Sequence, residues 1–219
     1  MMRGSLISAL LILAACDPVT VPERSTGEVY DFRLVAGADS VVMRWPNGSR
    51  IRVFVQPTDS ARDSLLIDSV ERGMVTWQMA SLFGNYRLER ASTPENADVI
   101  VGWSDTQLPV DVSQCVPAGA RAFTTFCLTG SEKRLAPFPL RNGVESQVRY
   151  LITIRAGETA NAAAVQQLVA HELGHVLGIG QHSPNPDDLM FTDPRRADLS
   201  VRDRATIQVL YQTRARIWP

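Results

Sequence analysis

Several features are scarce in this 219-residue chain, and each scarcity excludes a class of protein. A transmembrane helix needs about 20 apolar residues, and the apolar run at residues 6–15 supplies only about half of that. The formal net charge is -1 and no block of like charge occurs, so nothing favours nucleic acid or an acidic membrane surface as a partner. With 45% apolar and 21% charged residues, the composition predicts one globular domain behind a leader.

The N-terminus is typical of an exported protein. Arg3 precedes the apolar run, which is too short for a membrane span and ends in Leu13-Ala14-Ala15-Cys16. This ending resembles the lipobox of bacterial lipoproteins, whose cysteine is lipidated and becomes the mature N-terminus. The alternative is an ordinary signal peptide cut nearby. We therefore expect a leader over 1–15, lipidation at Cys16, and an extracytoplasmic protein whose membrane contact is this anchor.

Only three cysteines are present, an odd number for an exported protein. If Cys16 carries lipid, Cys115 and Cys127 remain as a pair in an oxidising compartment. Their disulfide would stabilise the fold by roughly 2–3 kcal/mol, and two free thiols are the alternative. The two cysteines are too far apart in sequence for the tight spacing of a cysteine zinc site.

The order of predicted elements indicates an α+β fold. Residues 16–49 read as a tether, rich in Pro, Thr and Ser over 17–28, followed by an N-terminal extension with strand-like runs at 29–35 and 41–45. From residue 50 to 219 we expect a single catalytic domain. Its predicted strands are 51–55, 86–91, 97–103, an edge strand at 121–128, and 148–154. Its predicted helices are 59–82, 158–177 and 200–212. This order predicts a mixed sheet of about five strands with the long helices on one side.

The sequence His171-Glu172-Leu173-Gly174-His175 lies within the second long helix. Histidines four residues apart share a helix face, so both imidazoles can bind one zinc ion, and Glu172 lies beside the metal where it can accept a proton from bound water. All three histidines of the chain fall between residues 171 and 182. Gly178 breaks the helix, which lets the chain bend back and present His182 as a third ligand.

The stretch HELGHVLGIGQHSPNPDDLMF resembles the zinc-binding region of the metzincin clan, and most of all that of bacterial matrixin-like proteases. The resemblance implies one catalytic Zn²⁺ and a methionine beneath it, here Met190. The residues do not determine whether a structural Ca²⁺ accompanies the zinc. Gln181 stands where the family has its third histidine and His182 follows one residue later, so Asp187 and Asp188 remain alternative ligands. The resemblance is specific over about 165–212.

Rival zinc-peptidase classes fit less well. One class takes its third ligand from a glutamate on a later helix, and no glutamate follows Glu172. Another uses a downstream aspartate, but Asp203 fits the last helix better as a cap or surface residue. We therefore expect a zinc endopeptidase that acts on peptide or protein substrates, with Glu172 as general base and the edge strand 121–128 as a place to bind substrate.

A zinc-binding surface or adhesion protein without turnover is the alternative, and zinc hydrolysis of a non-peptide substrate is a weaker one. A purely structural zinc site has no need of the Glu172 carboxylate, which argues against the first alternative. Cys16 is the only cysteine near the N-terminus, so the sequence shows no pro-segment thiol that would block the metal in a latent form.

Overall fold

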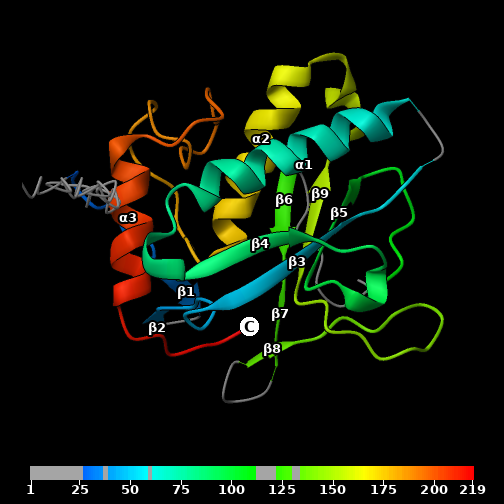
Figure 1. Ribbon diagram of the computed structural model, residues 1–219, viewed down its shortest axis with the longest axis horizontal. Helices are drawn as coiled ribbons and strands as arrows, with labels where there is room; N and C mark the ends of the chain where they lie inside the picture. Colours follow the sequence, from blue (N-terminus) through cyan, green and yellow to red (C-terminus); the bar gives the residue numbers. More distant parts are fainter. Residues whose placement is uncertain (1–26, 37–38, 59–60, 112–121, 130–133) are drawn as a thin grey trace, which may run out of the picture.

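A five-stranded mixed sheet is the centre of the molecule (Figure 1). The structure is a computed structural model, and it describes residues 27–36, 39–58, 61–111, 122–129 and 134–219. The strand order is β4-β3-β5-β9-β6, in which β6 alone runs antiparallel to its neighbour. These strands are β3 (Ser49–Val55), β4 (Tyr86–Arg90), β5 (Val99–Trp103), β6 (Ala122–Thr125) and β9 (Tyr150–Ile154).

Two small antiparallel ribbons and three short 3-10 helices accompany the sheet in the described part of the chain. The ribbons pair β1 (Leu34–Ala36) with β2 (Asp39–Val41), and β7 (Cys127–Thr129) with β8 (Arg134–Ala136). The 3-10 helices are η1 (Leu82–Gly84), η2 (Pro94–Asn96) and η3 (Ala156–Ala160).

The α-helices are α1 (Arg62–Gln78), α2 (Ala162–Val176) and α3 (Val201–Gln212). Helices α1 and α2 pack closely against each other, because Gly73 leaves no side chain between them: a Cβ there would lie 2.9 Å from Leu173. The indole of Trp77 also donates a 2.6 Å hydrogen bond to the carbonyl of Ala170. None of the helices in the described ranges has the length and apolar character that crossing a membrane requires.

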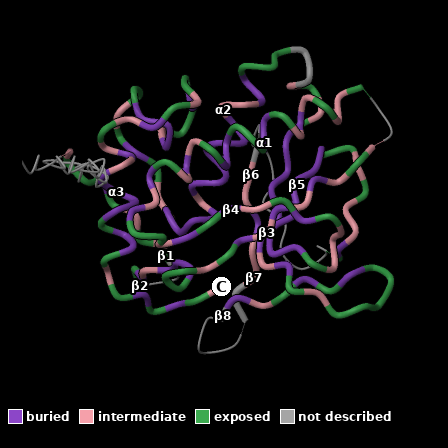
Figure 2. The backbone as a smooth tube through the Cα atoms, in the orientation of Figure 1, coloured by how far each residue is buried: buried purple, intermediate pink, exposed green. Residues whose placement is uncertain are grey.

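Both faces of the sheet are covered (Figure 2). Side chains alternate along a strand, so Val99 and Val101 point toward the helices whereas Ile100 points away from them. The face away from the helices packs against loop residues such as Val110 and Phe138. This arrangement confirms the predicted α+β fold class, with the two long helices on one side of a mixed sheet.

The N-terminal extension packs against the domain over its described residues. Tyr30, Met43 and Trp45 are all buried in the main core, and the Trp45 indole donates a 2.8 Å hydrogen bond to the Val176 carbonyl at the end of α2. Met43 also pairs with Ile217 near the C-terminus. The packed unit therefore includes chain upstream of residue 50, where the predicted catalytic domain begins. The predicted leader 1–15 lies outside the described residues.

The ends of several elements differ from the predicted ones. The helix expected at 158–177 begins at residue 162, because the Asn161 side chain caps it by accepting from the Ala164 N–H, while 156–160 forms η3. The helix expected at 59–82 spans only 62–78, and the chain then turns through Phe83, whose φ is 55°. The expected edge strand 121–128 divides into β6 and β7, which pair in different sheets.

Candidate metal centre

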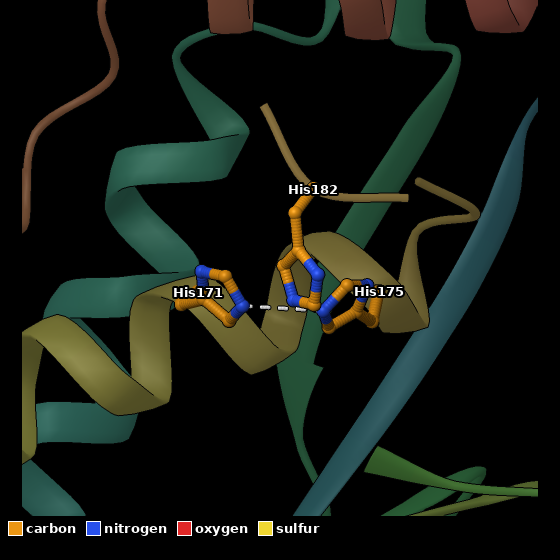
Figure 3. Close-up of side chains that lie close together, drawn as sticks. All are labelled: His171, His175 and His182. Atoms are coloured by element: carbon orange, nitrogen blue, oxygen red, sulfur yellow. Dashed lines mark hydrogen bonds between the residues drawn. The ribbon is translucent and has the colours of Figure 1, made fainter. Parts of the chain in front are cut away.

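Helix α2 and the loop after it bring the three histidines together. His171 and His175 stand one turn apart on α2, which ends just beyond His175 because Gly178 adopts a φ of 112°. The chain then reverses, and His182 returns toward the helix (Figure 3). The extra residue in the spacing is therefore accommodated in the loop.

The imidazole rings converge on one point (Figure 3). One ring nitrogen from each histidine lies within 4.8 Å of the other two, and Nε2 of His171 lies 3.2 Å from Nε2 of His175. The His182 ring stacks beside that of His171 with 5.2 Å between centroids, and it stands at 84° to that of His175. Three ligand atoms are thus available to a single ion.

Main-chain carbonyls fix the orientation of the two helical histidines. Nδ1 of His171 lies 2.9 Å from the Leu189 carbonyl, and Nδ1 of His175 lies 2.6 Å from the Ile179 carbonyl. A carbonyl only accepts, so each Nδ1 carries the proton and each Nε2 presents a lone pair. Two lone pairs 3.2 Å apart repel unless a cation lies between them. Two nitrogens bound tetrahedrally to zinc are about 3.3 Å apart, so the donor set fits zinc.

The electrostatics favour neutral, metal-ready imidazoles. Burial lowers the pKa of His171 well below its ordinary value, and the neighbouring histidines lower it further. Burial also lowers the pKa of His175, and burial together with His175 lowers the pKa of His182 to about 4. Metal binding at neutral pH therefore has few protons to displace from these rings.

Glu172 lies next to the histidines and is 4% exposed. Its Oε2 accepts a 2.7 Å hydrogen bond from the hydroxyl of Thr124 on β6. Burial raises the pKa of this carboxyl to about 7, although the Thr124 hydrogen bond opposes the rise. The residue therefore has the properties of a general base that works near neutral pH.

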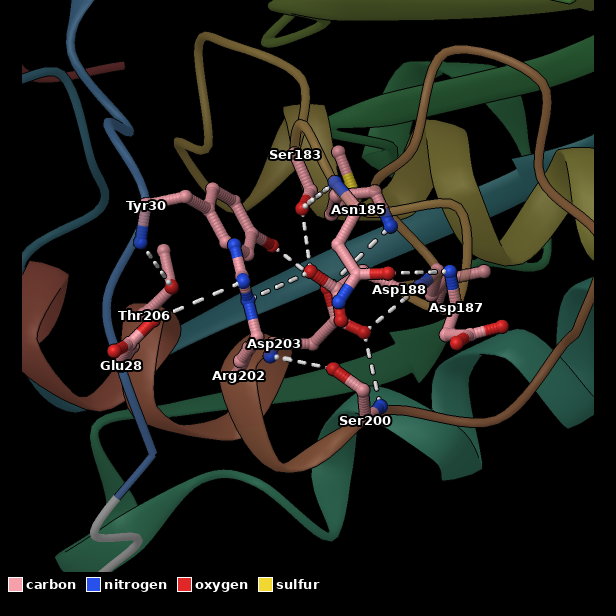
Figure 4. Close-up of polar contacts among 12 residues, drawn as sticks. Glu28, Tyr30, Ser183, Asn185, Asp187, Asp188, Ser200, Arg202, Asp203 and Thr206 are labelled. Carbon is pink, nitrogen blue, oxygen red and sulfur yellow. Dashed lines mark hydrogen bonds and ion pairs between the residues drawn. The ribbon is translucent and has the colours of Figure 1, made fainter.

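Neither alternative third ligand belongs to the three-histidine group. Asp188 is 1% exposed, accepts from the Ser183 hydroxyl, and forms a 3.1 Å ion pair with Arg202 of α3 (Figure 4). The exposed Asp187 lies in the same loop, which is closed by the hydrogen bond from the Ser183 N–H to the Met190 carbonyl. These contacts shape the loop that follows His182.

Met190 is fully buried beneath α2. Gly174, between the two helical histidines, leaves the space for it: a Cβ at this position would overlap the Met190 sulfur and lie 2.7 Å from the Trp77 ring. The soft thioether thus lies where the resemblance to metzincins places a methionine.

The Asp203 carboxylate supports this turn, a role that the sequence did not reveal. It is 0% exposed and accepts from the Leu189 N–H at 2.8 Å and from the Ser200 N–H at 2.9 Å (Figure 4). The Asp203 N–H donates a hydrogen bond to the Ser200 hydroxyl, so Asp203 takes part in the cap of α3 as expected. It is buried, however, and is not a surface residue. Thr124 is the second participant that sequence reasoning missed, since neither residue type nor spacing connects it to Glu172.

The cysteine predictions fall largely outside the described residues. Cys16 and Cys115 both lie there, whereas Cys127 begins β7. Lipidation of Cys16 and the pairing of Cys115 with Cys127 remain predictions.

A helix bearing two histidines and a glutamate, with a third histidine beyond a glycine turn, defines the class of the protein as a zinc metallopeptidase. The family model described as matrixin matches residues 95–212, which is more than half of the chain. The chain belongs to the matrixin family.

Among solved structures, the chain is similar to myroilysin, with 13% sequence identity and a TM-score of 0.45 over 80% of this chain and 98% of that one. It is also similar to archaemetzincin from Methanopyrus kandleri, with 13% identity and a TM-score of 0.41 over 75% of this chain and 96% of that one. Comparison with the sequences of curated proteins finds no significant match.

Proposed function

We propose that the protein is a zinc-dependent endopeptidase in which Glu172 is the general base. The observation that carries the proposal is a buried carboxylate on α2, placed in sequence between two histidines of the three-histidine group and oriented from a neighbouring strand. A site that only holds zinc has no use for such a carboxylate, because burying it is unfavourable.

His171, His175 and His182 would hold the zinc ion. When bound, zinc supplies a Lewis acid that polarises a carbonyl and makes water more acidic. Glu172 accepts a proton from the attacking water and then delivers it to the leaving amine, so one side chain is base first and acid later. In the metal-free protein burial raises the pKa of Glu172 to about 7, and a zinc ion bound nearby would lower it and so favour the ionised, base form.

The edge strand β6 is the proposed support for the substrate. Within the described residues it is hydrogen-bonded to β9 on one side only, and it forms the edge of the sheet nearest α2. An extended peptide can add to such an edge through main-chain hydrogen bonds, which is how many proteins bind peptides. Because such an edge can bind a segment in the middle of a long substrate chain, this mode of binding favours cleavage of internal peptide bonds.

The location of the protein is part of the proposal. The leader-like residues 6–15 followed by Cys16 support export and lipid anchoring outside the cytoplasm. Replacement of Cys16 by Ser should release the protein from the membrane fraction and abolish incorporation of a labelled fatty acid. Unchanged membrane association and labelling of the variant would contradict the anchor.

Cleavage of a mixed peptide library, analysed by mass spectrometry, tests the activity. The wild-type protein should cut within peptides, and a chelator should stop it. Glu172→Ala should lower kcat by about 10²–10⁴-fold while one zinc per chain is retained, because the carboxylate is not a ligand. Glu145→Ala, which removes an exposed carboxylate, is the control and should behave as wild type. A zinc-loaded wild type that cleaves no peptide would instead favour the non-catalytic zinc-binding alternative.

A further inference from the structure

We propose that Thr124 is a positioning residue for Glu172 and couples the edge strand to the general base. The inference rests on the proposed function, and it adds a residue that lies outside the helix and loop bearing the zinc ligands. Thr124 is 48 positions away from Glu172 in sequence and lies on the strand proposed to bind the substrate.

The Thr124 hydroxyl contacts Glu172 at two places. Oγ1 lies 2.7 Å from the carboxylate Oε2 and 3.1 Å from the main-chain carbonyl oxygen of the same residue. A glutamate side chain has three rotatable bonds and loses freedom only when its end is held. Because one hydroxyl reaches both the end and the root of this side chain, the carboxylate is fixed with Oε2 engaged. Among the described residues Oε1 has no partner, which leaves it to the reacting proton.

Burial makes this contact important. Glu172 is 4% exposed, so bulk water does little to orient or solvate its carboxylate. Within the described residues, its hydrogen-bond partner is Thr124. A hydrogen bond to a buried charged group is stronger than one between neutral groups, and its loss leaves the acceptor without a partner.

The strand that carries Thr124 is itself held in register. Thr124 stands opposite Ile152 of β9, and the pairs Phe123–Thr153 and Thr125–Leu151 flank it. A peptide that adds to the side of β6 away from β9 would extend this ladder and restrain the same strand. The main chain of β6 would bind the substrate, whereas the Thr124 hydroxyl orients the base. Loss of this hydroxyl should therefore lower kcat and leave KM unchanged.

The experiment compares four proteins on one peptide that the wild type cleaves. Thr124→Val keeps the shape of the side chain and removes the hydroxyl, whereas Thr124→Ser keeps the hydroxyl. Thr153→Val is the matched control, since Thr153 is a buried threonine of the neighbouring strand β9 and lies on the other face of the sheet with Leu151. Zinc content and the secondary-structure spectrum are measured for each.

We expect Thr124→Val to lower kcat by about 10–100-fold with KM and zinc content unchanged, which is the range found for groups that orient active-site residues. Thr124→Ser should recover most of the activity, and Thr153→Val should match the wild type. Wild-type kcat in Thr124→Val would overturn the inference, and so would an equal loss in Thr153→Val.

A second measurement does not depend on activity. Thermal unfolding of the metal-free protein is compared for wild type, Thr124→Val, Glu172→Ala and the double variant. Because the two side chains contact each other, the effects of the single changes should not add, and the unfolding constant of the double variant should differ several-fold from the additive value. Additive effects would refute the contact. If no peptide is cleaved but the unfolding measurements show non-additive effects, the proposed function fails while the contact between Thr124 and Glu172 stands.

Discussion

The phenol of Tyr30 donates a 2.7 Å hydrogen bond to the carboxylate of Asp203, 173 positions further along the chain. The same carboxylate accepts from the Leu189 N–H, and the Leu189 carbonyl in turn lies 2.9 Å from Nδ1 of His171. A short chain of hydrogen bonds therefore connects the N-terminal segment to His171 of the three-histidine group. Because the family model matches residues 95–212, Tyr30 lies outside the matched region.

Replacement of Tyr30 by Phe should destabilise the protein. The change removes one donor from a carboxylate that is 0% exposed, which costs about 1–3 kcal/mol in the free energy of unfolding. Denaturant unfolding of the two proteins measures the difference. Tyr150→Phe is the control, because the buried Tyr150 hydroxyl has no hydrogen-bond partner within the described residues, and its removal should be neutral or stabilising. Equal effects of the two changes would contradict the assigned role of Tyr30.

The identity of the third zinc ligand can be tested directly. His182→Ala should lower zinc affinity by more than about 100-fold, because it removes a ligand rather than a group that orients one. Asp187→Ala should leave zinc affinity unchanged, since the three-histidine group does not include this aspartate. Competition with a chelator of known affinity gives both values. The reverse pattern would assign the ligand to Asp187.

Much of the site could be predicted from the sequence because its parts are local. The helical spacing of His171 and His175 places both rings on one face, and Gly178 signals the turn that returns His182. The capping role of Asp203 at the start of α3 could also be predicted, since Ser200 and Asp203 have the spacing of a capping box.

The contacts that orient the site could not be predicted, because they join residues that only the fold brings together. Thr124 reaches Glu172 only because β6 pairs with β9 at the edge of the sheet beside α2. Tyr30 reaches Asp203 only because the N-terminal segment lies along α3. A threonine in an expected edge strand and a tyrosine in an expected extension carry no local signal of either role.

The stability of the metal-free protein should depend on pH through Glu172. Its pKa is about 7 in the folded protein against an ordinary value of 4.5, so the folded state binds the proton more tightly. Stability is therefore fully present below pH 4.5 and is lost as pH rises toward 7 and beyond. Glu172→Gln lacks this loss, and above pH 7 it should be more stable than wild type by on the order of 3 kcal/mol.

Thermal unfolding in a chelator at pH 5 and at pH 8 measures this difference between Glu172→Gln and wild type. The three histidines are common to both proteins, so their own titration cancels in the comparison. The advantage of the variant should be large at pH 8 and small at pH 5. An advantage that is the same at both pH values would show that the Glu172 charge is not destabilising in the folded protein.

Gly180 is the point where the N-terminal segment meets the loop that carries His182. Its N–H donates a 2.8 Å hydrogen bond to the Phe32 carbonyl, and a Cβ at this position would lie 2.8 Å from both N and Cα of Leu34. Main-chain atoms cannot rotate away as a side chain can, so Gly180→Ala must push the loop and the segment apart. We expect a loss of about 1–3 kcal/mol in stability and a zinc affinity lowered by about 10–100-fold, because His182 is only two residues away. Gly157→Ala, where the added methyl group meets only open space, should change neither quantity. Normal zinc affinity in Gly180→Ala would show that His182 keeps its position without the N-terminal segment.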